Sequence, residues 1–344
     1  MNFNNGNVNN NNKQTAKYYV RFVRGYQEMF TYRQLYDCYI KCRKNKRNTV
    51  NQLAFEINAE YNLLRLKDDL NKKTYCPARS ICFVVDRPKL REIFAADFKD
   101  RVVHHVLINH LEPFAESKFI FDSYACRKDK GTHRAVKRLQ GFARGVTRNC
   151  KDQAYCLQLD VRSFFVSIDK KILFDLIKKY TCDPEMIWLA QIIIFNDCTQ
   201  NCRMIKGKDL IRYIPEHKTL FKQDKNKGLP IGNLTSQFFA NVYLNELDQF
   251  VKHDLKCRYY LRYSDDALIL HKNKTQLVEW KKQIRLFLKT RLNVDLNEKK
   301  TIINPLDNGI NYLGYIVRPF YILVRRRVIS NLKQKIFSGV LTKE

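Results

Sequence analysis

Long hydrophobic runs are missing from this sequence of 344 residues. The longest apolar run, from Ile187 to Phe195, is interrupted by Gln191 and is too short to span a bilayer. The chain also begins with a polar stretch at Met1 and lacks a charged and then apolar signal sequence. We therefore expect a soluble, cytoplasmic protein with no membrane partner.

Cysteine pairs at framework spacings are missing as well. Eleven cysteines are scattered along the chain, and such an odd number is typical of reduced thiols in a cytosolic compartment. The pairs Cys38/Cys42 and Cys198/Cys202 each supply at most half of a structural zinc site. We expect free thiols.

Acidic residues are scarce relative to basic ones. The chain has 34 of them against 63 lysines and arginines, which gives a formal net charge of +29, and 45% of its residues are hydrophobic. That apolar content is sufficient for the core of one or two domains. The positive charge indicates a polyanionic partner held through phosphate contacts, and nucleic acid is the first candidate.

Three aspartates stand out against this basic background. Asp265 and Asp266 lie between two apolar, β-prone runs, a pattern that predicts a hairpin with the acids at its tip. Two such carboxylates repel each other unless a cation lies between them. The apolar run from Tyr155 predicts another strand, which ends at Asp160. If these elements are neighbours, they form an oxygen-rich site of the kind that binds Mg²⁺. Pairs of such ions, roughly 3.5–4 Å apart, catalyse phosphoryl and nucleotidyl transfer.

Three segments resemble the motifs of reverse transcriptases. Residues 159–165 (LDVRSFF) resemble the first catalytic motif, residues 263–266 (YSDD) the tyrosine-x-Asp-Asp box, and residues 228–237 (GLPIGNLTSQ) the template-and-nucleotide motif. The Ile-Gly-Asn and Ser-Gln of the last motif are similar to the reverse transcriptases of diversity-generating retroelements, within the broader group II intron-like enzymes. The resemblance extends from about residue 79 to residue 315.

The resemblance implies an α+β right-hand polymerase fold, with an antiparallel-sheet palm, fingers and a short helical thumb. Apolar residues at helical spacing predict helices before the fingers, at Leu53, Ile57, Tyr61 and Leu64. The expected divisions are a disordered Asn-rich tail (1–14), an N-terminal helical extension (15–78), fingers (79–154), a palm (155–317) with a fingers-like insertion at about 196–227, and a short basic thumb (318–344).

The resemblance also implies the catalytic residues. Asp160, Asp265 and Asp266, with the Val161 carbonyl, would hold two Mg²⁺ ions, for which Mn²⁺ can substitute. Adjacent strand residues point to opposite faces, so Asp266 can support the site without ligating metal throughout the cycle. Lys300 would protonate the departing pyrophosphate, although a surface lysine needs no role.

Further residues are expected to contact the substrates. Phe165 would exclude a ribose 2′-hydroxyl and so select deoxynucleotides. Lys89 and Arg91, on a predicted hairpin, would grip the triphosphate; ordinary surface cations are the alternative. The full nucleotide-binding set is Lys89, Arg91, Phe165, Ile231 and Gly232. The template and primer set is Arg127, Ser236, Gln237, Tyr263, Ser264, Leu313, Gly314 and Tyr315.

Ile231 departs from the glutamine that most relatives carry. An apolar contact discriminates poorly between similar ligands, so we expect low fidelity. The resemblance implies that template adenines are the bases most often misread.

The implied partners are a template RNA, a cDNA or primer strand, deoxynucleoside triphosphates and a small basic accessory protein. A reverse transcriptase of retron, antiphage or group II intron lineage is the nearer alternative. Ile231 with Gln237 disfavours the other lineages, and the expected thumb leaves little chain for a maturase or endonuclease domain. A non-catalytic RNA-binding protein is the more distant alternative, disfavoured by the presence of all three aspartates.

Overall fold

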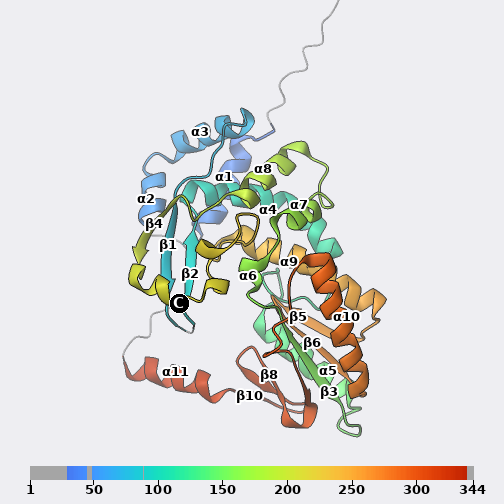
Figure 1. Ribbon diagram of the computed structural model, residues 1–344. Coiled ribbons are helices and arrows are strands. Elements are labelled where there is room, and N and C mark those ends of the chain that lie inside the picture. Colours follow the sequence, from blue (N-terminus) through green and yellow to red (C-terminus); the bar gives the residue numbers. More distant parts are fainter. Residues whose placement is uncertain (1–28, 45–48, 88, 339–344) are drawn as a thin grey trace, which may run out of the picture.

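The computed structural model describes residues 29–44, 49–87 and 89–338. The predicted Asn-rich tail at residues 1–14 lies outside these ranges. Two sheets, joined by a long central helix, organise the described part of the chain, and a third small sheet follows them (Figure 1).

Helices α1 and α2 pack against the long helix α4, and α3 packs against α1 and α2. Their inward side chains include Phe55, Leu63, Leu66 and Leu70. Thr31 caps the first helix by accepting a hydrogen bond from the Gln34 N–H. The four helices are α1 (Tyr32–Arg43), α2 (Val50–Glu56), α3 (Ala59–Asn71) and α4 (Phe98–Lys118).

The apolar stripe predicted for this region is not the buried one. Leu53, Ile57, Tyr61 and Leu64 are all exposed. The predicted stripe assumes one continuous helix, whereas the chain breaks between α2 and α3 at residues 57–58. The helices are therefore found where the sequence predicts helical structure, but a different set of apolar residues forms their core.

The first sheet has the order β2-β1-β4. Strands β1 and β2 form the predicted antiparallel hairpin, while β4 joins β1 in parallel from a distant part of the chain. The buried Glu92 carboxylate accepts hydrogen bonds from the Thr219 hydroxyl (2.6 Å) and the Leu220 N–H (2.5 Å), which ties the segment after β4 to this sheet. The elements are β1 (Ser80–Val85), β2 (Arg91–Ala95), β4 (Cys202–Lys206), η1 (Lys208–Tyr213), η2 (Glu216–Lys218) and η3 (Leu220–Lys222).

The central sheet has the order β5-β6-β3-β7, with antiparallel pairing throughout. Both of its faces are covered, so its strands are apolar on both sides. Leu157 and Ile269 contribute to the largest core cluster, and Cys156 and Leu268, one residue away, contribute to the cluster that includes α5. The elements are α5 (Thr132–Val146), β3 (Tyr155–Asp160), β5 (Tyr259–Tyr263), β6 (Asp266–His271), α10 (Lys274–Leu292) and β7 (Ile302–Pro305).

Helix α9 lies between the two sheets and is almost entirely buried (Figure 1). Because both sides of the helix pack against protein, apolar residues occur all round it, unlike the one-sided pattern of a surface helix. This burial fixes the template-and-nucleotide motif, which leads into the helix. The elements around it are α6 (Phe164–Ser167), α7 (Lys170–Ile177), α8 (Pro184–Phe195), α9 (Leu234–Gln249) and the π-helical η4 (Phe250–Asp254).

The C-terminal part forms a small antiparallel sheet and a projecting helix (Figure 1). Helix α11 is the predicted basic helix, and none of its described residues is buried. Its start is held to the sheet by a hydrogen bond from the Arg325 N–H to the Gly314 carbonyl (3.0 Å). The elements are η5 (Leu306–Asn308), β8 (Ile310–Tyr312), β9 (Tyr315–Val317), β10 (Ile322–Val324) and α11 (Arg326–Phe337).

Two expectations about composition can be compared with these elements. In the described ranges, no helix is both long and apolar enough to cross a membrane. None of the eleven cysteines, all of which lie in the described ranges, forms a disulfide. The predicted division into tail, extension, fingers, palm and thumb stays a prediction.

Candidate active site

The acidic hairpin predicted from the sequence is formed by β5 and β6. Its turn passes through Ser264, which has a left-handed backbone (φ +56°), and Asp265. Non-glycine residues adopt this conformation only when their surroundings hold it. Arg262 does so by donating a hydrogen bond from Nη1 to the Ser264 carbonyl (2.9 Å). The turn that carries Asp265 is therefore fixed from within the protein.

Arg262 belongs to a buried network that the sequence analysis missed. Its side chain is 1% exposed, and its Nη2 lies 2.7 Å from the Asp248 carboxylate, which is fully buried on α9. The Tyr260 hydroxyl donates to the same carboxylate (2.6 Å), and Arg262 also reaches Asn241 (3.2 Å). A charged residue inside an otherwise apolar strand was the signal in the sequence. The network connects the catalytic hairpin to the central helix.

Asp160 and Asp266 lie directly opposite each other on adjacent strands. The register of β3 and β6 pairs their Cα atoms, and Asp160 is the last residue of β3. The prediction that residue 160 meets the hairpin of residues 265 and 266 is therefore confirmed at the level of strand pairing. Asp160 is 7% exposed, whereas Asp266 is exposed and Asp265 is half-buried.

Lys300 and Asn297 hold the carboxylate of Asp160. The Lys300 ammonium lies 2.7 Å and 2.9 Å from its two oxygens, and the Asn297 amide donates to one of them (2.8 Å). The Asn297 N–H also donates to the Asp160 carbonyl (2.8 Å). Lys300 thus reaches the site for which it was predicted. Asn297, which the sequence analysis did not single out, positions the first aspartate.

The electrostatics of the three aspartates favour a bound cation. Displacement of water by the surrounding protein, with repulsion from Asp160, raises the pKa of the Asp265 carboxyl. Asp266 is exposed on one side, yet the protein around it displaces part of the water near its carboxyl. This loss of water, together with repulsion from Asp265 and Asp160, raises the pKa of Asp266 to about 7. Lys300 supplies one compensating charge at Asp160, and a divalent cation would supply more.

The side chains of the three aspartates do not converge as a set of metal ligands in the described part of the chain. Within the described part of the chain, no group of three or more His, Cys, Asp or Glu side chains is placed to hold a metal ion. The donor chemistry nevertheless fits Mg²⁺, because hard carboxylate oxygens are the ligands that this ion prefers. Asp160, Asp265 and Asp266 would hold it with the carbonyl of Val161, the residue directly after β3.

Phe164 and Phe165 have different environments. Phe164 is 2% exposed and packs against Tyr243 (centroids 6.3 Å apart), so it belongs to the core. Phe165 is half-buried, with its ring 5.5 Å from that of Phe164. Phe165 is therefore the less buried residue of the pair, and its role in selecting deoxynucleotides stays a prediction.

The template-and-nucleotide motif is attached to the predicted nucleotide-binding hairpin. The Ile231 carbonyl accepts a hydrogen bond from the Phe94 N–H (2.8 Å) on β2. Gly232 has φ +125°, and a Cβ atom there would lie 2.8 Å from the Phe94 carbonyl, so only glycine fits. Arg91 begins the same strand β2, and Lys89 precedes it as an exposed residue. Strand β2 thus connects Ile231 and Gly232 to the predicted triphosphate-binding residues, Lys89 and Arg91.

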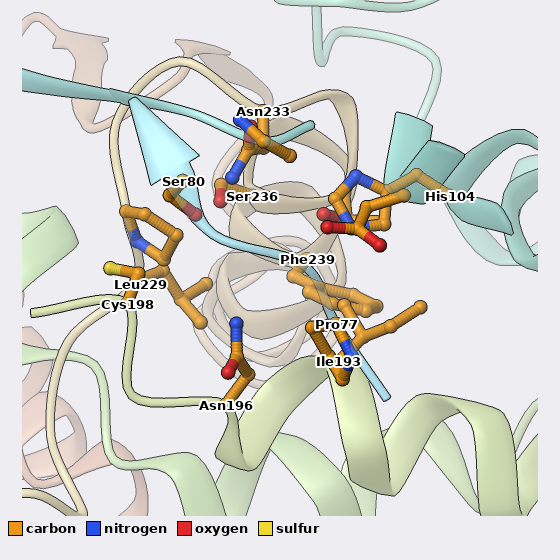
Figure 2. A pocket seen from close by; sticks show the side chains of 14 residues that line it. Pro77, Ser80, His104, Ile193, Asn196, Cys198, Leu229, Asn233, Ser236 and Phe239 are labelled. Atoms are coloured by element: carbon orange, nitrogen blue, oxygen red, sulfur yellow. The ribbon is translucent and has the colours of Figure 1, made fainter. Parts of the chain in front are cut away.

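Ser236 does not face a template, and this prediction is wrong. The residue is 2% exposed and lines a small internal cavity of about 20 Å³. Figure 2 shows it among Ser80, Asn233 and His104, which line the same cavity. Its position on a helix buried on both sides turns the hydroxyl inward. Gln237, the next residue, is exposed and remains available to nucleic acid.

Arg127 is also placed differently from its predicted role. Its side chain is 6% exposed and pairs with Glu116 (2.7 Å). It further donates to the carbonyls of Ile120 (2.7 Å) and Ser123 (2.9 Å). These bonds occupy the guanidinium, so Arg127 fastens the loop after α4 and does not contact the template.

The remaining predicted primer residues lie around the start of α5. The Tyr263 hydroxyl accepts from Thr132 (3.3 Å), the first residue of α5. The Tyr315 hydroxyl lies 3.5 Å from His133 Nδ1. Leu313 and Gly314 form the turn between β8 and β9, both with positive φ. The structure therefore brings the YSDD tyrosine and the predicted primer grip to the same helix end.

Comparison with solved structures defines the class of fold. The chain is similar to telomerase from Candida tropicalis, in the apo form truncated from the C-terminal domain, with a TM-score of 0.52 and 13% identity over 78% of this chain and 60% of that one. The fold is thus a mixed α+β right-hand polymerase fold, which confirms the predicted fold class.

Comparison with known sequences then defines the family. Residues 70–317 match the model of the reverse transcriptase (RNA-dependent DNA polymerase) family, and the chain belongs to this family. Protein YkfC of Escherichia coli K12 is 24% identical over 323 residues, which cover 83% of this chain and 79% of YkfC. The group II intron-encoded protein LtrA of Lactococcus lactis is 22% identical over 76% of this chain and 50% of its own length. The chain therefore spans about half the length of LtrA.

Proposed function

We propose that this protein copies RNA into DNA by nucleotidyl transfer at Asp160, Asp265 and Asp266. The observation that carries the proposal is the pairing of Asp160 with Asp266 on adjacent strands, in a chain that belongs to the reverse transcriptase family. The net charge of +29 supports it, because a duplex of template and product is a polyanion.

The residues of the site have separate tasks in this reaction. The primer 3′-hydroxyl attacks the α-phosphate of a deoxynucleoside triphosphate paired to the template. Asp160, Asp265 and Asp266 would hold Mg²⁺, which would supply positive charge to stabilise the attacking and leaving oxygens. Lys300, whose side chain is 52% exposed beside Asp160, donates a proton to the departing pyrophosphate. Lys89 and Arg91 neutralise the triphosphate, and Phe165 excludes the 2′-hydroxyl of ribonucleotides.

Primer extension tests the activity directly. The purified chain, given an RNA template, an annealed DNA primer, deoxynucleoside triphosphates and Mg²⁺, is expected to extend the primer to the template end. Ribonucleoside triphosphates in the same reaction are expected to be poor substrates. An absence of extension on several RNA templates, with binding of the same duplex intact, would contradict the proposal.

The particular role that we propose is error-prone copying for a diversity-generating retroelement. It is supported by Ile231, whose carbonyl is fixed to β2 and whose half-buried side chain offers no hydrogen bond near the nascent base pair. Template RNA and a small basic accessory protein would be the partners. The similarity to LtrA supports a group II intron-like lineage as the alternative.

Replacing Ile231 with glutamine is expected to lower misincorporation at template adenines roughly fivefold, since one added hydrogen bond is worth about 1 kcal/mol. Ile231→Leu is the matched control, because it keeps an apolar side chain and should leave the error spectrum unchanged. The measurement is sequencing of cDNA made from one defined template. An I231Q spectrum identical to that of the parent chain would rule out this origin of low fidelity.

A further inference from the structure

Lys170 is a largely buried cation whose ammonium has no described hydrogen bond or close ion pair. It is the first residue of α7 and is 5% exposed. Burial lowers the pKa of the Lys170 ammonium, and attraction to Asp197 and Asp224 opposes this shift only in part. A buried ammonium costs stability unless an anion or hydrogen-bond acceptor compensates it. Its position therefore indicates a ligand that supplies negative charge.

The ammonium borders a polar cavity of about 150 Å³. One wall is the start of the template-and-nucleotide motif, at Gly228 and Pro230. The segment after α8 (196–200) forms a second wall, and η3 with the residues after it forms a third. The Gly228 N–H donates to the Ile168 carbonyl (2.8 Å) and the Leu229 N–H donates to the Phe165 carbonyl (2.7 Å). The cavity thus shares a wall with the predicted nucleotide-binding residues but lies outside their set.

The lining of the cavity carries a net positive charge that a ligand with a single negative charge would balance. Lys170, Lys225 and Lys227 are the basic residues of its lining, and Asp197 and Asp224 are the acidic ones, which leaves one net positive charge. A phosphodiester carries one negative charge, whereas a free nucleotide carries about two. The linkage between two nucleotides therefore fits better than a free nucleotide.

The two acidic residues accept hydrogen bonds from neighbouring residues of their own loops. Asp197 accepts hydrogen bonds from the Thr199 N–H (3.0 Å) and hydroxyl (2.6 Å). Asp224 accepts from the Asn226 N–H (2.7 Å). Neither carboxylate makes a described ion pair with Lys170, so the ammonium stays available to a ligand. Phe221, which is 38% exposed, gives the cavity an aromatic edge on which a base can stack.

We propose that this cavity binds one nucleotide of the single-stranded template RNA, with its phosphodiester on Lys170 and its base against Phe221. This inference rests on the proposed function, because it assumes that the nucleic acid bound here is the template RNA. The nucleotide would contact the back of the loop that carries Ile231, so that an unpaired template base is held while its neighbour is copied.

Equilibrium binding of primer–template duplexes tests the proposal. The full chain is titrated with duplexes that have no 5′ RNA overhang or overhangs of one to six nucleotides, without divalent metal or nucleotides. Lys170→Met is expected to weaken overhang binding about tenfold and to lower the salt slope by roughly one phosphate contact, while blunt duplex binding stays the same. Lys170→Arg should restore most of the affinity. Lys171→Met, an exposed neighbour with the same charge change, is the matched control.

Two further results separate this site from a structural lysine and from a site for free nucleotides. K170M should be at least as stable to urea as the parent chain, because a costly buried charge is removed. A destabilised K170M with unchanged overhang affinity would overturn the proposal. Adenosine monophosphate that binds through Lys170, with no overhang dependence, would overturn the template assignment. Because extension is not measured, failure of the polymerase activity would be a separate result.

Discussion

Replacing Asp265 with asparagine is expected to slow primer extension by a factor on the order of a thousand or more. The change keeps the shape of the side chain but removes the charge that would hold the metal, and charge stabilisation is commonly the largest contribution to such reactions, about 4 kcal/mol for a thousandfold effect. The measurement is single-turnover extension of a DNA primer on an RNA template.

Asp307→Asn is the matched control, because Asp307 is exposed and lies on η5, outside the site. Its rate is expected to equal that of the parent chain. The Asp265→Asn variant should remain folded, since neighbouring carboxylates and loss of water already disfavour the charged form of Asp265. A folded D265N that keeps more than about a tenth of the parent rate, a loss of under 1.4 kcal/mol, would refute the assignment.

The second large effect is expected at the buried ion pair of Arg262 and Asp248. Replacing Asp248 with alanine leaves a guanidinium that is 1% exposed without its counter-charge. Breaking such a pair commonly costs about 3–5 kcal/mol, so the free energy of unfolding in urea should fall by that amount. Asp254→Ala, an exposed substitution on η4, should change it by less than about 0.5 kcal/mol.

A double variant distinguishes stability from positioning. Asp248→Leu combined with Arg262→Met removes both charges, and such apolar replacements are often neutral or stabilising. Most of the lost stability should return. Activity should not, because the Ser264 carbonyl then lacks the Arg262 donor that holds the turn carrying Asp265. Full recovery of activity in the double variant would show that the network is not needed to position the turn.

Local sequence patterns predicted the catalytic elements well. The hairpin at residues 259–271 and the strand that ends at Asp160 follow from short apolar runs bounded by polar residues, and both are present. That these two elements are neighbours was predicted from the chemistry of their carboxylates, because three carboxylates close together require a shared cation. The same patterns could not reveal β4, which is only five residues long and joins β1 across more than a hundred residues.

The sequence did not predict the direction in which individual side chains point. Ser236 and Arg127 belong to segments that resemble substrate-contacting motifs, yet both point into the protein. Helix α9 is buried on both sides, so its sequence gives no polar face that marks the substrate side. Likewise, Leu53 and Leu64 fit a helical period but lie on the outer face, because the chain breaks between α2 and α3.

Anomalous scattering from crystals soaked in Mn²⁺ would show whether a metal ion binds between the three aspartates, because it locates the ion without requiring turnover. We expect Mn²⁺ to be bound by the carboxylates of Asp160 and Asp265, with the Lys300 ammonium displaced from Asp160. Crystals at saturating Mn²⁺ that keep the Lys300–Asp160 pair and show no anomalous density beside these aspartates would contradict it.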